Sequence, residues 1–174
     1  VMPADQMVTT CGNSFKIIRT WTVIDWCSGS FVTVGSNGED NVQVIKVEDS
    51  KAPVITRAPF EAYANIPGQH PMGCRSQGLL LPPVVSDNCN SVTVQIITPA
   101  GEAIYLPGGP LQGGLIPPPG LPIGTHLITY IATDACGNQS AIGVPVTVKD
   151  NITPAVVCDG ITEVSLTTTG QATV

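Results

Sequence analysis

Residues 20–27, TWTVIDWC, return about a hundred positions later as TYIATDAC at 129–136. Further along, QVIKVEDSKAP at 43–53 is matched by VPVTVKDNITP at 144–154. Repetition at this period indicates an array of small domains, and a unit of about a hundred residues is an ordinary size for one β-sandwich. The segments between the matched stretches differ in length, as expected for hairpin loops.

The repeat unit divides the chain into one complete and two partial repeats. Residues 1–51 hold the closing half of a repeat, residues 52–153 hold a whole repeat, and residues 154–174 hold the opening strands of a third. No signal peptide and no apolar run long enough to span a bilayer is present. We therefore expect a piece of a longer array.

Composition favours an all-β fold. Charged residues make up 11% of the chain, Gly and Pro number 18 and 16, and long stretches of good helix formers are absent. Short β-branched runs such as FKIIRTWTVI and THLITYIAT are separated by turn residues, which is typical of a sandwich. Their alternation places Ile128, Tyr130 and Ala132 on a buried face, and Trp21 and Val23 at equivalent positions. We interpret these side chains as core anchors.

Six cysteines without a CxxC pair indicate disulfides in an oxidising compartment, and hence secretion. Because Cys27 and Cys136 are equivalent in the repeats, their partners should be equivalent too. We expect Cys11 to pair with Cys27, and Cys89 to pair with Cys136.

Two cysteines are left without an assigned partner. A short loop joining Cys74 to Cys89 competes with the second expected disulfide, so this alternative stays open. Cys158 stands at the start of the third repeat, and its partner is not defined by the sequence.

The sequence carries no pattern for catalysis, and we expect no enzyme activity. It has no G-x-S-x-G elbow, no Walker or dinucleotide-binding glycine pattern and no H-E-x-x-H. A net charge of −6 with seven basic residues argues against nucleic acid or an anionic membrane surface as a partner.

Acidic residues near the repeat boundaries form the best candidate for a metal site. Asp49, Asp134, Asp150 and Asn151 offer hard oxygen ligands where tandem β-domains would join, which is the chemistry that calcium needs. Asp87 and Asn138 are further turn residues of this kind. The alternative is that these side chains only bond to the local backbone of their turns.

A long Pro/Gly-rich arm occupies residues 99–122, with seven prolines and six glycines. Connections of more than about a dozen residues are usually functional or disordered. Its apolar side chains form a candidate contact surface: Tyr105, Leu106, Leu111, Leu115 and Ile116. The alternative is an arm folded back on its own domain.

The closing strands resemble a known module. GTHLITYIATDACGNQSAIGVPVTVKD at 124–150 is similar to the hyalin repeat (HYR), whose closing half reads G-T-x-x-V-x-Y-x-A-x-D-x-x-G-N followed by a V-x-V-x-D strand. RTWTVIDWC at 19–27 and the P-x-x-x-C opening at 154–158 resemble repeats of large secreted or surface proteins of Bacteroidota-type bacteria. The resemblance implies tandem immunoglobulin-like sandwiches that serve adhesion or scaffolding, with no catalytic residues.

We therefore expect a structural repeat module of an extracellular fibre, filament or adhesin. Its partners would be neighbouring repeats or other copies of itself, joined head-to-tail along one chain or by strand exchange. Two alternatives are a glycan- or protein-binding module that uses the arm, and an accessory domain of a secreted carbohydrate-active enzyme. No nucleic-acid binding or membrane insertion is expected.

Overall fold

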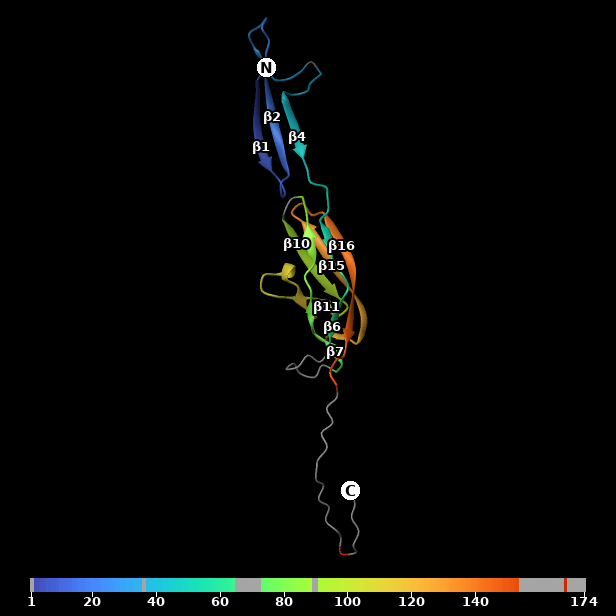
Figure 1. The fold of residues 1–174 in the computed structure, drawn as a ribbon. Coiled ribbons are helices and arrows are strands. Elements are labelled where there is room, and N and C mark those ends of the chain that lie inside the picture. The colour runs from blue at the N-terminus through green and yellow to red at the C-terminus, as the bar shows by residue number, and fades with distance from the viewer. Residues whose placement is uncertain (1, 36, 65–72, 89–90, 154–167, 169–174) are drawn as a thin grey trace.

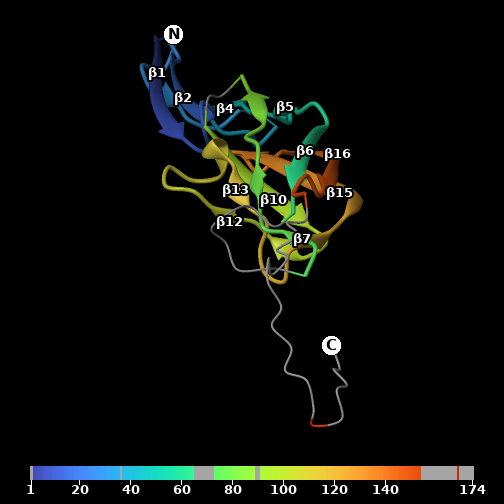
Figure 2. The ribbon, with the colours of Figure 1, turned by 60° about the horizontal axis from the view of Figure 1, so that its bottom comes forward.

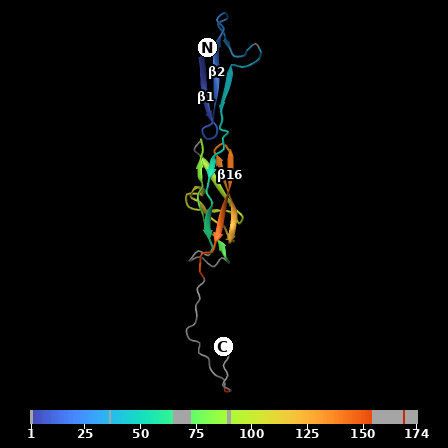
Figure 3. The same ribbon diagram turned by 45° about the vertical axis from the view of Figure 1, so that its right-hand side comes forward.

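The structure is a computed structural model that describes residues 2–35, 37–64, 73–88, 91–153 and 168. It is all-β, as the composition predicts, with one short 3-10 helix at Pro110–Gln112 in the described part. No helix in these residues is long and apolar enough to cross a membrane. Two parts lie end to end: an N-terminal sheet and a central body of residues 53–149 (Figures 1 and 3).

The N-terminal sheet is built around strand β2 (Phe15–Ile24). β1 (Met2–Thr9) and β4 (Val42–Val47) flank β2 in antiparallel register, and the short β3 (Phe31–Val32) pairs with its end. Thr9 and Val47 both lie opposite Phe15, so these three residues share one face of the sheet.

The central body has a five-stranded main sheet in the order β11-β10-β15-β16-β6. Its strands are β11 (Gly101–Glu102), β10 (Val92–Thr98), β15 (Gly124–Asp134), β16 (Gln139–Lys149) and β6 (Phe60–Tyr63). β6 runs parallel to β16, and the other pairings are antiparallel.

Three small sheets complete the central body. They are β12 (Ile104–Tyr105) with β13 (Gly114–Leu115) and β8 (Leu79–Leu80), β14 (Leu121–Pro122) with β7 (Arg75–Ser76), and β5 (Val54–Thr56) with β9 (Val84–Ser86). Figure 2 shows β12 and β13 beside each other next to β10. Strand β5 packs on β15 and β16, so a second layer covers the main sheet.

The core lies between these layers and follows the predicted alternation. Ile128, Tyr130 and Ala132 are fully buried, as the sequence pattern predicts. Buried side chains from the small strands, among them Ile55 and Leu80, belong to the same cluster. The Tyr130 hydroxyl donates a hydrogen bond to the Leu81 carbonyl at 2.9 Å, and burial raises the pKa of this phenol to about 12.

The N-terminal sheet has no such core among the described residues. One face, which we call the open face, carries Met7, Phe15, Ile17, Trp21, Val23, Ile45 and Val47. Met7 is 65% exposed and Val47 is 43% exposed. Trp21 and Val23 lie on this face, but they are half-buried and not core anchors as expected, because no second layer covers them in the described residues.

Candidate functional site

Three segments meet where the N-terminal sheet joins the central body, and we call this place the junction. They are the β1–β2 turn at 10–14, the linker at 48–53 and the β15–β16 turn at 134–138. Each of the two turns closes an antiparallel hairpin. The two hairpins end at the facing ends of the two parts, so both turns lie at the junction.

A disulfide joins the two turns: Cys11 bonds to Cys136, with their Cα atoms 5.0 Å apart. Both expected pairings are therefore wrong, since Cys11 does not pair with Cys27 and Cys136 does not pair with Cys89. Cys27 is exposed with a free thiol. The ten-residue strand β2 separates Cys11 from Cys27 by about 30 Å, whereas a disulfide needs Cα atoms within about 7 Å.

The other cysteines of the sequence analysis lie elsewhere. Cys74 is exposed with a free thiol at the start of β7. Cys89 and Cys158 fall outside the described residues, so the alternative pairing of Cys74 with Cys89 stays a prediction.

The β15–β16 turn is organised by the carboxylate of Asp134. Its Oδ1 accepts hydrogen bonds from the backbone N–H groups of Cys136 and Asn138, both at 2.8 Å, and its Oδ2 accepts one from Asn138 Nδ2 at 2.7 Å. Burial of this side chain opposes ionisation, but these hydrogen bonds outweigh burial and hold the Asp134 pKa below its ordinary value.

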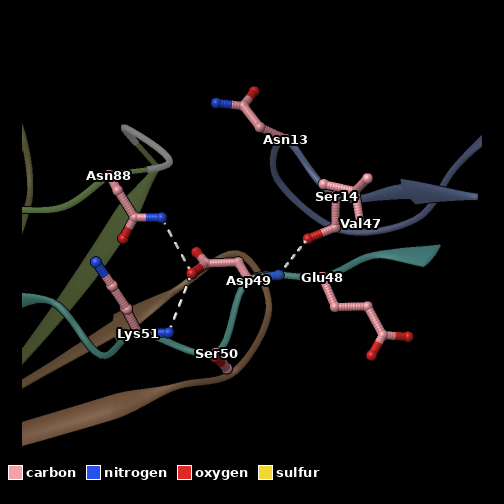
Figure 4. A pocket seen from close by; sticks show the side chains of 8 residues that line it. All are labelled: Asn13, Ser14, Val47, Glu48, Asp49, Ser50, Lys51 and Asn88. Carbon is pink, nitrogen blue, oxygen red and sulfur yellow. Dashed lines mark hydrogen bonds between the residues drawn. The ribbon is translucent and has the colours of Figure 1, made fainter.

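The linker is held on both sides through Asp49. Its backbone N–H donates to Ser14 Oγ of the β1–β2 turn at 2.9 Å, and its carbonyl accepts from Asn138 Nδ2 at 3.2 Å. Its Oδ1 accepts from the Lys51 N–H at 3.1 Å and from Asn88 Nδ2 at 3.0 Å, as Figure 4 shows. Ser140 Oγ donates to the Pro53 carbonyl at 2.6 Å. Backbone and side chains thus fix the linker against both parts.

The junction also gathers three carboxylates. One oxygen each of Asp49, Asp87 and Asp134 lies within 4.8 Å of the others. Such closely spaced negative charges repel one another, and a divalent cation with oxygen ligands would offset that repulsion. Hard oxygen donors of this kind fit calcium, so these three side chains could hold it.

Two of the four expected metal ligands are therefore brought together, namely Asp49 and Asp134. Asp150 and Asn151 follow β16 at the opposite end of the central body, where Asp150 Oδ1 accepts from the Ile152 N–H at 3.0 Å. Asp87, which the sequence indicates only as a further turn residue of this kind, supplies the third carboxylate. Its place in the turn after β9 was the available signal, but only the fold shows that this turn reaches the junction.

A second turn repeats the geometry of the β15–β16 turn at the far end of β2. Asp25 Oδ1 accepts from the Cys27 N–H at 2.9 Å, and Asp25 Oδ2 accepts from Ser28 Oγ at 2.7 Å. The hydrogen bond from Ser28, with help from the Cys27 N–H, lowers the Asp25 pKa. Asp25 and Cys27 thus match Asp134 and Cys136 in structure as well as in sequence.

The Pro/Gly-rich arm is folded back on its own part of the chain, the second of the two alternatives. Ile116 is 1% exposed in the core, and Tyr105 accepts a hydrogen bond from the Ile96 N–H at 3.1 Å through its hydroxyl. Leu106 and Leu115 are half-buried, and Leu111 is 45% exposed. Ile116 was wrongly included in the contact surface, because a β-pairing of β12 with β13 carries the arm back toward the core.

Comparison of the chain with models of known families and with curated proteins gave no match.

Proposed function

We propose that this chain is a structural module of an extracellular fibre or adhesin, built from tandem immunoglobulin-like repeats that resemble HYR modules. The observation that carries the proposal is the open face of the N-terminal sheet. The large apolar side chains of this face lie beside the Asp5–Arg19 ion pair with no second layer over them in the described residues, and such a surface is one that another polypeptide covers.

The partner is inferred from the correspondence between the two parts. Strands β1, β2 and β4 pair in the same order as β10, β15 and β16. Trp21 has the position in β2 that Tyr130 has in β15. In the central body, opening strands such as β5 and β8 cover the equivalent face with Ile55 and Leu80. The opening strands of another repeat would cover the open face in the same way.

Residues 154–174 have the sequence of such opening strands, with Pro154 matching Pro53. Complete burial of a large apolar side chain contributes ~1.5–3 kcal/mol. Several side chains of this size lie on the open face, so docking of an opening segment would be strongly favoured. Copies or successive repeats would then join head-to-tail.

The contacts at the junction favour a rigid joint that transmits mechanical force, and argue against a flexible connection between the two parts. A disulfide, a hydrogen-bonded linker and three converging carboxylates hold consecutive units in one orientation. Calcium bound by Asp49, Asp87 and Asp134 would stiffen this joint further. The disulfide favours an oxidising, extracellular location.

A glycan- or protein-binding role for the arm is the second candidate. It is supported by Leu111 and Ile104, which are 45% and 51% exposed. Most of the other apolar side chains of the arm are used within the central body, so this role has less support. No observation favours an accessory domain of an enzyme.

The test is assembly of the 174-residue chain, followed by sedimentation and electron microscopy. We expect linear assemblies of the native chain. Trp21→Asp on the open face should abolish them, while the matched change Thr22→Asp on the opposite face should leave them intact. An excess of a synthetic peptide of residues 154–174 should also block assembly. A native chain that stays a stable monomer at tens of micromolar would refute the proposal.

A further inference from the structure

Two free thiols lie at opposite ends of the described structure. Cys27 is in the turn that follows β2 at the outer end of the N-terminal sheet, and Cys74 immediately precedes β7 at the far end of the central body (Figure 1). Both are exposed. In a head-to-tail array, these two ends of successive copies would face each other.

Cys27 is the equivalent of Cys136, which already forms a disulfide between consecutive units. Its N–H donates to Asp25 Oδ1 at 2.9 Å, as the Cys136 N–H donates to Asp134 Oδ1 at 2.8 Å. In both turns a glycine N–H donates to the carbonyl of the same aspartate. The turn at Cys136 receives Cys11 from the preceding unit, so the turn at Cys27 is built to receive an equivalent cysteine.

The surroundings of Cys27 are those of an uncovered contact. Trp26, directly before it, is 89% exposed, and Phe31 of β3 is 68% exposed. At the corresponding place in the other turn, before Cys136, the residue is Ala135. Large exposed aromatic side chains beside a free thiol indicate a surface that a partner covers.

Cys74 lies at the end of the central body that corresponds to the end of the N-terminal sheet where Cys11 lies. Cys11 lies in the turn directly before β2, the central strand of its sheet. Arg75 of β7 pairs with Pro122 of β14, so Cys74 lies beside the residue that directly precedes β15, the matching central strand. Cys74 has a positive φ of 60°, a backbone conformation that is found mostly in turns.

We propose that Cys74 of one copy forms a disulfide with Cys27 of the next, and that this bond staples the array at every boundary between copies. The proposal rests on the head-to-tail assembly proposed above and names its covalent bond. It makes the boundary between copies chemically equivalent to the internal junction, where the Cys11–Cys136 bond plays the same part.

The bond forms by thiol–disulfide exchange with a small disulfide such as oxidised glutathione. The Cys27 thiolate attacks one sulfur of oxidised glutathione, which gives a mixed disulfide and releases one glutathione. The Cys74 thiolate of the second copy then attacks the Cys27 sulfur and displaces the second glutathione. Two cysteine thiols are oxidised to one disulfide, one glutathione disulfide is reduced, and the two protons end on the released thiols.

The experiment uses the 174-residue chain in a glutathione redox buffer, quenched with acid and run on non-reducing denaturing gels. We expect a ladder of dimers, trimers and longer species from the native chain, and a peptide containing Cys27 linked to Cys74 by mass spectrometry. Cys27→Ser alone and Cys74→Ser alone should each give monomers. An equal mixture of the two variants should give a dimer and nothing longer, because one thiol of each kind remains.

The outcomes separate this inference from the proposed function. Assemblies seen by electron microscopy that contain no Cys27–Cys74 bond would refute the staple and leave the fibre proposal standing. Absence of assemblies in both oxidising and reducing buffer would refute the fibre proposal. Linkage of Cys27 or Cys74 to Cys89 or Cys158, or symmetric Cys27–Cys27 dimers, would also overturn the staple.

Discussion

Removal of the Cys11–Cys136 disulfide should separate the unfolding of the N-terminal sheet from that of the central body. The bond closes a loop of 125 residues, for which the chain-entropy model gives about 5 kcal/mol of stabilisation. The N-terminal sheet has no buried apolar core of its own in the described residues, so it depends on the junction more than the central body does.

The change is the double variant Cys11→Ser with Cys136→Ser, and the matched control is Cys27→Ser, which removes an exposed thiol from the equivalent turn. Urea unfolding followed by two probes distinguishes the parts: fluorescence of Trp21 and Trp26 reports on the N-terminal sheet, and far-ultraviolet circular dichroism reports on the whole chain.

We expect one transition from the native chain and the control. The double variant should show an early fluorescence transition, lowered by several kcal/mol, and a later one dominated by the central body. Coincident transitions at the native midpoint in the double variant would show that the hydrogen bonds of the junction hold the two parts together without the disulfide, and the reasoning would be wrong.

Two further predictions concern the carboxylates and the core. Calcium should raise the unfolding midpoint, and chelation should reverse this rise. Asp87→Asn should abolish the rise, whereas Asp150→Asn should leave it unchanged. A rise that persists in Asp87→Asn would exclude the three-carboxylate site. Tyr130→Phe should cost about 1–3 kcal/mol in chemical denaturation, because the Leu81 carbonyl loses its buried donor. Since folding raises the Tyr130 pKa from 10.0 to about 12, its contribution should be complete below pH 10 and decline as the pH rises toward 12. The native denaturation midpoint should not stay constant from pH 10 to about 12, and it should not equal that of Tyr130→Phe at every pH. Either result would contradict the role of Tyr130 as a buried hydrogen-bond donor.

The period-two pattern predicted the buried face of β15 because that pattern is set by strand geometry alone. Ile128, Tyr130 and Ala132 needed only the alternation of a strand to be placed correctly. The all-β fold followed for the same reason, from composition and short alternating runs.

The disulfide could not be predicted in this way, because pairing depends on where strand ends meet in space. Equivalence of Cys27 and Cys136 was a sound inference, but it was combined with the assumption that each repeat closes its own bond. The structure shows instead a bond between the N-terminal sheet and the central body. The convergence of Asp87 with Asp49 and Asp134 could not be predicted for a related reason, since it depends on where the turn after β9 lies in the folded chain.

The position of the Cys11–Cys136 bond determines how the chain responds to a pulling force. A tension applied at the two ends passes from Cys11 directly to Cys136, so the residues between them carry none of it. At about 3.4 Å per extended residue, this shields about 430 Å of chain from stretching. Only the segments outside the bond can lengthen, among them β1 and β16. Under oxidising conditions only these outer segments would extend, and reduction of that single bond would release the shielded length.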